Sequence, residues 1–223
     1  DLILVGDSLG SVLYNYKSTR NVTLDVMIEH SKSVRLGIKK SLMIVDMPYK
    51  TYRNKKEALK NCKKIIKETK CDGVKLEGGV KIKNIVNHLI INKIPVMGHI
   101  GILPQLVRGK FKSKGKSEKE KKQLMKDAVI LEKMGCFGIV LECIEKNLSN
   151  KITKAIKIPT IGIGSSNCCD GQILVTDDLL GLTNSKIKFV KKYVDLKKNI
   201  RKGVKKFKSE VINKKYPTKS YSY

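Results

Sequence analysis

The sequence predicts a (β/α)₈ barrel, and three observations lead to that fold class. A short apolar run rich in Val and Ile, ending at a polar or glycine residue, recurs along the 223-residue chain. Lysine-rich stretches with helical periodicity separate these runs, and the alternation favours a parallel sheet with right-handed crossovers. Polar side chains follow nearly every run, and the C-terminal ends of barrel strands are where functional sites form.

The predicted strands are continuous apolar runs, which suit strands that are buried on both faces. They comprise residues 2–5, 42–45, 73–76, 94–98, 138–141, 159–163 and 172–175. Since a complete barrel has about eight strands, we expect the first strand and helix to lie upstream of residue 1. Residues 1–223 would then be a single, N-terminally incomplete barrel domain. An open doubly wound sheet is the alternative, and it would gather ligands at one switch point.

The segments between the strands predict helices and one long loop. Residues 55–70 and 119–134 each place apolar side chains on one helical face. Residues 103–122 form a long connection rich in glycine and lysine, which predicts either a mobile loop over a site or a surface insertion. From about residue 184 to residue 223 we expect outer helices and a frayed tail.

The charge balance is strongly basic, with 47 Lys and Arg against 20 Asp and Glu, a formal net charge of +27. Such a surface can bind nucleic acid. However, only five of these residues are Arg, and the lysines are spread along the whole chain. We therefore expect no specific nucleic-acid partner, and a basic nucleic-acid-binding protein on a barrel scaffold is kept as an alternative.

Apolar runs and cysteines indicate the compartment. The chain has no run of about 18 apolar residues, so we expect no membrane span. Its six cysteines contain no C-x-x-C pair, and most lie in or beside apolar or helical segments. Reduced, buried thiols favour a cytoplasmic location. An organellar targeting segment would lie upstream of residue 1.

Acidic side chains at the ends of successive strands predict a metal site. Asp7, Asp46 and Glu77 follow three successive strands, and on one rim they would repel one another strongly without a cation. Oxygen ligands with no nearby cysteine favour Mg²⁺. The alternative for each of these residues is a helix N-cap, and for Asp7 and Ser8 taken alone the two interpretations are about equally good.

The later strands add a lysine, a histidine and a glutamate. Lys75 shares a strand face with Glu77, and an inward lysine needs an anionic partner, either a substrate or only a neighbouring carboxylate. Glu142 ends an apolar strand, where burial would raise its pKa toward that of a general base; a structural ion pair is the alternative. His99 is expected to contact the residues that bind the ligand without binding the ligand itself.

Six sequence blocks, in this order and at compatible spacing, resemble ketopantoate hydroxymethyltransferases. The similarity runs from residue 1 to about residue 220, and six ordered blocks are far more specific than any one motif. The blocks are Val5-Gly6-Asp7-Ser8-Leu9-Gly10, Val45-Asp46-Met47-Pro48, Val74-Lys75-Leu76-Glu77-Gly78-Gly79, Gly98-His99-Ile100-Gly101-Ile102-Leu103-Pro104-Gln105, Leu141-Glu142-Cys143, and Gly162-Ile163-Gly164 with Asp170-Gly171-Gln172.

This resemblance implies a barrel of the phosphoenolpyruvate/pyruvate type and a specific reaction. The implied reaction moves a hydroxymethyl group from 5,10-methylenetetrahydrofolate to 3-methyl-2-oxobutanoate through a Mg²⁺-stabilised enolate. The products are 2-dehydropantoate and tetrahydrofolate, within pantothenate and coenzyme A synthesis. The resemblance also implies a homo-oligomer.

The positions of the motifs imply a role for each site residue. Glu142 would be the proton acceptor. Mg²⁺ would be held by Asp7, Asp46 and Glu77. The oxo acid would be bound by Asp7, Ser8, Asp46 and Lys75.

Besides Lys17, where a more neutral or acidic residue is usual, the chain departs from the family pattern at four further positions. Phe111 and Lys114 lie in the long connection, where the family tends to have Tyr and Gln. Ser165 and Ser166 stand where Ala and Gly are usual, so the turn after Gly164 has one glycine fewer. These departures could weaken folate binding. A missing first strand would expose an edge of the last strand, so a truncated, inactive relative is a second alternative.

Overall fold

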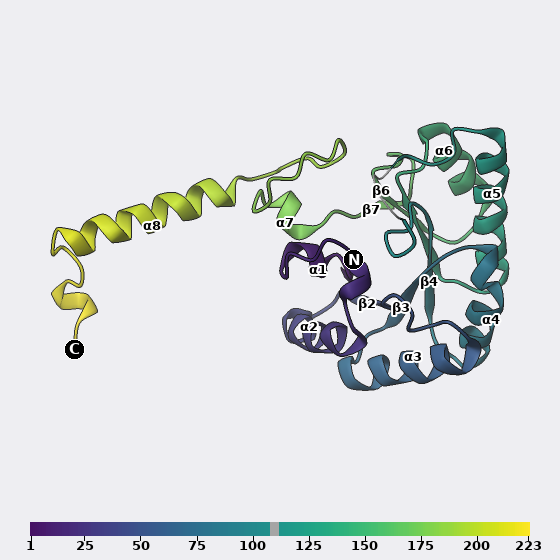
Figure 1. Cartoon of the computed structure of the whole chain (residues 1–223), viewed down its shortest axis with the longest axis horizontal. Coiled ribbons are helices and arrows are strands. Elements are labelled where there is room, and N and C mark those ends of the chain that lie inside the picture. Colours follow the sequence, from purple (N-terminus) through teal and green to yellow (C-terminus); the bar gives the residue numbers. More distant parts are fainter. Residues whose placement is uncertain (108–111) are drawn as a thin grey trace. The chain divides into compact units, whose positions relative to one another are not determined.

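The computed structural model describes residues 1–107 and 112–223 of the chain (Figure 1). The chain divides into two compact units, residues 1–173 and 174–223, and each is described by itself. In the described residues, the first unit holds a seven-stranded parallel sheet whose strand order follows the chain order. The strands are β1 (Leu2–Val5), β2 (Leu42–Asp46), β3 (Gly73–Glu77), β4 (Val96–Gly101), β5 (Gly138–Glu142), β6 (Thr160–Ile163) and β7 (Gly171–Gln172).

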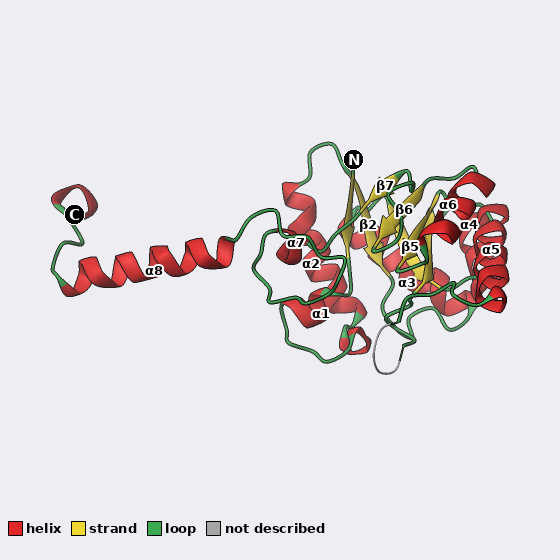
Figure 2. Cartoon of the chain, turned by 90° about the horizontal axis from the view of Figure 1, so that it is seen from above, coloured by secondary structure: helices red, strands yellow, loops and turns green. Residues whose placement is uncertain are grey.

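Helices connect the strands and cover the outside of the sheet (Figures 1 and 2). The α-helices are α1 (Leu9–Val12), α2 (Leu24–Gly37), α3 (Lys55–Thr69), α4 (Lys83–Ile91), α5 (Glu118–Lys133) and α6 (Lys146–Ala155). Two short 3₁₀ helices span Thr19–Asn21 and Val80–Ile82. This arrangement confirms the predicted α/β class, a parallel sheet curled among helices.

Local sequence signals define where the main helices begin. At α3, the Asn54 side chain accepts a hydrogen bond from the backbone N–H of Glu57. At α5, the Ser117 side chain accepts one from Glu120. An Asn or Ser cap satisfies a backbone donor that would otherwise lack a partner at the helix start, and it stabilises a helix by about 1 kcal/mol. These caps set α3 and α5 at nearly the residues that helical periodicity predicts.

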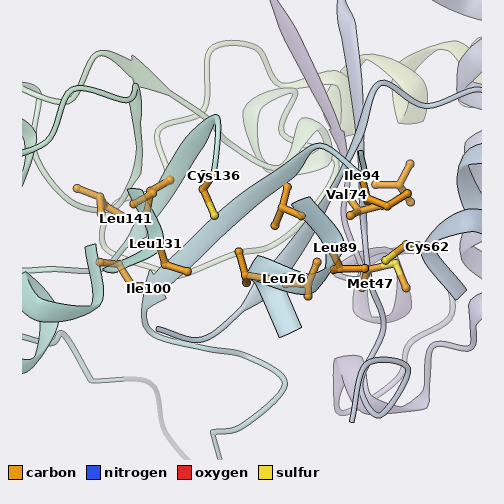
Figure 3. Close-up of a cluster of buried hydrophobic side chains, with 14 of the residues drawn as sticks. Met47, Cys62, Val74, Leu76, Leu89, Ile94, Ile100, Leu131, Cys136 and Leu141 are labelled. Atoms are coloured by element: carbon orange, nitrogen blue, oxygen red, sulfur yellow. The ribbon is translucent and has the colours of Figure 1, made fainter. Parts of the chain in front are cut away.

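The main apolar core lies between the sheet and the helices (Figure 3). Along β3, Val74 and Leu76 belong to this core, and so does Ile100 on β4. Leu131 of α5 packs on the same layer, close enough to Gly98 that a Cβ there would lie 2.8 Å from its Cδ1. Complete burial of one leucine side chain contributes about 1.5–3 kcal/mol. This layer therefore holds the strands at fixed positions beneath the helices.

The opposite face of the sheet is apolar at one end and charged at the other. Ile44, Met97 and Val140 form a second, smaller core cluster. Because successive side chains on a strand point to opposite faces, Lys75 points away from the core that contains Val74 and Leu76. The inner face consequently carries the polar groups toward the C-terminal ends of the strands.

The strand boundaries differ from the prediction at β4 and β7. β4 begins at Val96 and continues through His99 to Gly101, so His99 lies within the strand and not after it. β7 covers only Gly171–Gln172 and ends before the apolar residues that follow. In the described part of the chain, β1 and β7 are the two edges of the sheet.

The second unit contains α7 (Thr176–Leu179), α8 (Leu196–Ile212) and a 3₁₀ helix at Lys219–Tyr221. The Asp195 side chain accepts a hydrogen bond from the N–H of Lys198 and so caps α8. None of the helices in residues 1–107 and 112–223 combines the length and apolar character needed to cross a bilayer. All six cysteines are free, and four of them are buried, which agrees with the expected reduced thiols.

Candidate active site

The parallel register brings the predicted polar residues to one end of the inner face. Asp46 of β2 lies beside Lys75 of β3, and Glu77 at the end of β3 lies beside His99 of β4. Glu142 ends β5 beside Gly101. The side chains of adjacent strands therefore stand next to one another at the same rim, as expected for the C-terminal ends of parallel strands.

Asp7 and Asp46 are in direct contact. The backbone N–H of Asp7 donates a hydrogen bond to Oδ2 of Asp46 over 3.1 Å, and both residues are almost fully buried. Burial, followed by repulsion from Asp46, raises the pKa of Asp7 to about 7. Two carboxylates so close in a low-dielectric site cannot both be ionised at low cost, so this pair attracts a positive charge.

Lys75 supplies a positive charge to the cluster. Its Nζ lies 3.1 Å from Oδ1 of Asp46 and 2.9 Å from Nδ1 of His99. Burial by itself lowers the pKa of Lys75, but the Asp46 and Glu77 carboxylates outweigh burial and raise it. The ammonium therefore stays charged. In this conformation its anionic partner is the neighbouring carboxylate of Asp46, one of the two partners that the sequence allowed.

Glu77 completes the acidic cluster. Burial raises its pKa to about 8; the Lys75 charge opposes this shift, and repulsion from Asp7 and Asp46 adds to it. Its Oε2 accepts a hydrogen bond from the backbone N–H of Gln105 over 3.0 Å. Its Oε1 lies 3.8 Å from Nδ1 of His99. The three predicted carboxylates are thus brought into one buried cluster.

His99 connects the cluster to Glu142. Its Nε2 lies 3.1 Å from Oε2 of Glu142, whose side chain is 19% exposed, the most accessible of the acidic groups on this rim. An ammonium has no acceptor, so Lys75 donates to Nδ1 of His99 and the ring hydrogen falls on Nε2, facing Glu142. Nε2 is close to this carboxylate, but the alignment falls short of a formed hydrogen bond. Burial, followed by the Lys75 charge, lowers the pKa of His99, which favours the neutral ring.

Ser8 stands at the N-cap position of α1 but does not cap it. Its side chain makes no cap hydrogen bond in this structure, and the neighbouring Asp7 contacts Asp46 and Gln105. The N-cap alternative therefore does not describe these two residues. Ser8 is a partly exposed residue directly after Asp7 of the acidic cluster.

Two further residues of the site have no role in the sequence-based assignment. Gln105 is 1% exposed, and its Nε2 donates to Oδ2 of Asp7 over 2.8 Å. The hydroxyl of Tyr52 lies 2.7 Å from Oε1 of Gln105. Gln105 belongs to one of the six blocks that resemble the family, and that membership is the sequence signal that pointed to it. Its contact with Asp7 could not be predicted from strand ends, because Gln105 lies in the loop after β4.

The donor chemistry of the cluster fits a hard divalent cation, although the present side-chain orientations do not form a metal site. Within residues 1–107 and 112–223, no group of three or more His, Cys, Asp or Glu side chains is arranged to hold a metal ion. Oδ1 of Asp46 is buried and, within those residues, makes no aligned hydrogen bond, although Nζ of Lys75 lies 3.1 Å away as its ion-pair partner. Burial first, and repulsion between the carboxylates after it, raises the pKa values of Asp7 and Glu77, and a bound cation would favour their charged forms. Metal binding would require the carboxylate oxygens that Gln105 does not hold to converge on one ion.

The glycine turn and the positions that depart from the family pattern lie beside the rim. A Cβ on Gly162 would come within 2.9 Å of the Gln172 side chain, so tight packing accounts for this glycine. Ser165 donates to the carbonyl of Leu141 and accepts from the N–H of Ile144.

The remaining departures lie in the turn and in the long connection. Ser166 donates to Asn150. Lys114 accepts a hydrogen bond from Glu145 through its backbone carbonyl and donates one to Cys143. Phe111 lies outside the described residues, as do the other residues of the stretch 108–111 in the expected mobile loop.

Comparison with known proteins identifies the family. The family profile described as ketopantoate hydroxymethyltransferase matches residues 1–219. The 3-methyl-2-oxobutanoate hydroxymethyltransferase of Pelagibacter ubique is 61% identical over 223 residues, covering 100% of this chain and 86% of that protein. The enzyme of the same name from Rhizobium etli is 45% identical over 227 residues, covering 100% of this chain and 83% of that protein.

Solved structures support the fold. A crystal structure of 2,3-dimethylmalate lyase, a member of the PEP mutase/isocitrate lyase superfamily, superposes with a TM-score of 0.51 at 10% identity. The match covers 72% of this chain and 57% of that one, so the chain spans just over half of its length. This likeness bears on the fold alone, and it agrees with the expected phosphoenolpyruvate/pyruvate type. The profile match and the two relatives show that the chain belongs to the ketopantoate hydroxymethyltransferase family.

Proposed function

We propose that this chain transfers a hydroxymethyl group from 5,10-methylenetetrahydrofolate to 3-methyl-2-oxobutanoate and yields 2-dehydropantoate for pantothenate and coenzyme A synthesis. The observation that carries the proposal is the buried cluster of Asp7, Asp46, Glu77 and Lys75 on the same rim as Glu142. The names of the full-length relatives support the choice of the oxo acid.

The rim offers groups for an anionic oxo acid. Lys75 has a raised pKa and stays charged, so its ammonium can hold the developing negative charge of the substrate. The Ser8 hydroxyl is not used as a helix cap and can donate to the substrate carboxylate. Hydrogen bonds to a charged group contribute about 1.5–3 kcal/mol each. Lys75 and Ser8 would therefore orient the oxo acid at the C-terminal ends of the strands.

The acidic residues would hold Mg²⁺. Asp7, Asp46 and Glu77 provide oxygen donors, which this ion prefers. When bound, Mg²⁺ would polarise the 2-oxo group and offset negative charge on its oxygen. Lys75 would give up part of its contact with Asp46 when the carboxylates turn toward the ion.

Glu142 would remove the proton from C3 of the oxo acid. It is the most accessible acid on the rim, and the His99 ring hydrogen that faces it can steady its carboxylate. The electron pair left on C3 forms the new C–C bond to the methylene carbon, and the folate nitrogen–carbon bonds break to release tetrahydrofolate. One water is consumed, because the donor methylene carries no oxygen for the hydroxyl group.

Deuterium exchange tests the proposal without the folate. The protein is incubated with 3-methyl-2-oxobutanoate in D₂O, with Mg²⁺ or with excess chelator, and the C3 proton signal is followed by NMR. We expect Mg²⁺-dependent loss of the signal, unchanged in Glu118→Gln, a control at an exposed carboxylate that pairs with Lys121. A C3 signal that persists at every Mg²⁺ concentration would contradict the proposal and favour the inactive relative.

The partner and location predictions remain to be tested. Sedimentation velocity measures the predicted homo-oligomer, and cell fractionation measures the predicted cytoplasmic location. The nucleic-acid alternative predicts tight, steeply salt-dependent binding together with no Mg²⁺-dependent exchange, so the same preparation distinguishes it from the enzyme.

A further inference from the structure

Gln105 is the centre of a buried hydrogen-bond network that links distant parts of the chain. Its backbone N–H donates to Oε2 of Glu77 over 3.0 Å. Its side-chain Nε2 donates to Oδ2 of Asp7 over 2.8 Å and to the carbonyl oxygen of Met47 over 2.9 Å. One fully buried residue thus holds two of the three acidic side chains, and it does so through two different donors.

The neighbours of Gln105 fix which way its amide points. Both hydrogens of Nε2 face acceptors, namely Asp7 and the Met47 carbonyl, so the amide oxygen must face Tyr52. The Tyr52 hydroxyl, 2.7 Å from Oε1, is then the donor. Burial, followed by the charge of Glu77, raises the pKa of Tyr52, which keeps this hydroxyl protonated. A flipped amide would place its oxygen against a carboxylate and a carbonyl, so a single orientation is stable.

The backbone of Gln105 is held as well. Nε of Arg20 donates to the carbonyl oxygen of Gln105 over 2.7 Å. The Arg20 guanidinium itself lies 4.8 Å from the centre of the Tyr49 ring. The N–H, the carbonyl and both ends of the side chain of Gln105 are therefore each engaged, which leaves this residue little freedom.

Gln105 engages one oxygen of each carboxylate. It binds Oδ2 of Asp7 and Oε2 of Glu77, and it does not hold Oδ1 or Oε1. Donors that fix ligating side chains from behind raise metal affinity, and their loss costs about 10–100-fold in affinity or activity. A donor between two mutually repelling carboxylates also offsets part of that repulsion.

We propose that Gln105 is a positioning residue that presents Asp7 and Glu77 to the metal ion, and that Tyr52 sets the direction of its amide. This inference rests on the proposed function. It assigns to Gln105 and Tyr52 no contact with the reacting atoms. Their effect should therefore appear in metal binding before any substrate is added.

Metal binding tests the proposal directly. Free Mn²⁺, used as a spectroscopic probe in place of Mg²⁺, is titrated into the full chain, and its EPR signal gives the dissociation constant. We expect Gln105→Met to weaken Mn²⁺ binding by about 10–100-fold and Tyr52→Phe to weaken it by a smaller factor, about 3–10-fold. Gln123→Met is the matched control, because Gln123 makes a comparable bond to Asp127 on the exposed face of α5.

The kinetic profile separates positioning from general damage. Positioning predicts that saturating Mg²⁺ restores most of kcat in Tyr52→Phe, while the concentration of Mg²⁺ needed for half-maximal rate rises. Loss of kcat without a change in Mn²⁺ affinity would overturn the proposal, in either variant. If Gln105→Met does not fold, Tyr52→Phe, which removes a single oxygen, decides by the same criterion. Wild-type protein that binds no Mn²⁺ would contradict the proposed function and this inference together, whereas equal Mn²⁺ affinity in wild type and both variants would contradict this inference alone.

Discussion

Nε2 of His99 lies 3.1 Å from Oε2 of Glu142, and the two side chains come from the adjacent strands β4 and β5. On the other side of the ring, Lys75 donates to Nδ1. A histidine held in this way has its tautomer determined by the ammonium behind it. The ring hydrogen therefore points at the carboxylate assigned to proton transfer, and the incomplete alignment between them leaves room for adjustment when a substrate binds.

Glu142→Gln should abolish deuterium exchange at C3 of 3-methyl-2-oxobutanoate, because an amide cannot accept the proton. The rate should fall by at least about 100-fold, the lower range for loss of a general base. Mn²⁺ affinity and oxo-acid affinity, measured by EPR and calorimetry, should stay within a few-fold of wild type. Exchange that persists at the wild-type rate would remove Glu142 from this role.

His99→Gln should slow exchange without preventing it. The variant loses the hydrogen bond between the charged Lys75 and the ring, together with the ring's contact with Glu142. Loss of a hydrogen bond to a charged group costs about 1.5–3 kcal/mol, or about 10–100-fold. Single-turnover exchange rates at saturating Mg²⁺ provide the measurement. An unchanged rate would show that Glu142 keeps its orientation without the imidazole.

Asp7→Asn should change how the stability of the metal-free protein depends on pH. The pKa of Asp7 is raised from 3.8 to about 7 by burial and by Asp46. The folded protein therefore binds a proton that the unfolded chain releases near pH 4, and the stabilisation present below that pH is lost as pH rises toward 7. Asn imitates the protonated acid and does not titrate. Relative to wild type, the variant should gain on the order of 4 kcal/mol between pH 4 and pH 8.

Urea unfolding in the presence of chelator measures this difference at each pH. Taking variant minus wild type removes the contribution of the exposed titratable groups that both proteins share. A difference that stays constant from pH 4 to pH 8 would contradict the assignment of a raised pKa to Asp7.

Gly101→Ala should disrupt the site through the backbone of Glu142. Gly101 has φ of +103°, and a Cβ there would lie 2.1 Å from the carbonyl oxygen of Glu142. Steric displacement of this strand end should lower both activity and stability, the latter by more than about 1 kcal/mol. Gly37→Ala at the end of α2 is the control, because apart from its own helix backbone and chain neighbours no atom lies within 4 Å of the added Cβ. Thermal unfolding and deuterium exchange measure both effects.

Much of the fold could be predicted because it depends on local patterns. The apolar runs predicted at β1, β2, β3 and β5 are strands in the structure, because a strand buried on both faces of a parallel sheet needs a continuous apolar sequence. Helical periodicity predicts the ends of α3 and α5 to within one residue. The ends of β4 and β7 were less accurate. In β4, His99 and Gly101 interrupt the apolar run although the strand continues through them. In β7, apolar residues continue after the pairing has ended.

The acidic cluster could be predicted because the C-terminal ends of adjacent parallel strands lie at one edge of the sheet. The positions of Asp7, Asp46 and Glu77 after successive strands were enough to predict that they lie close together. Gln105 and Tyr52 could not be found in that way. They come from loops, and the contact between Gln105 and Asp7 spans 98 residues of sequence. The raised pKa values of Asp7 and Glu77 likewise arise from burial, which no residue type specifies.

The sequential strand order has a consequence for synthesis on the ribosome. Each strand pairs with the one made immediately before it, so the sheet can grow as the chain emerges, N-terminal part first. Asp7, Asp46 and Glu77 are all synthesised before Gln105. Lys75, which pairs with Asp46, is also synthesised before Gln105. A nascent chain about half made would thus gather its negative charges while the amide that orders them is still inside the exit tunnel.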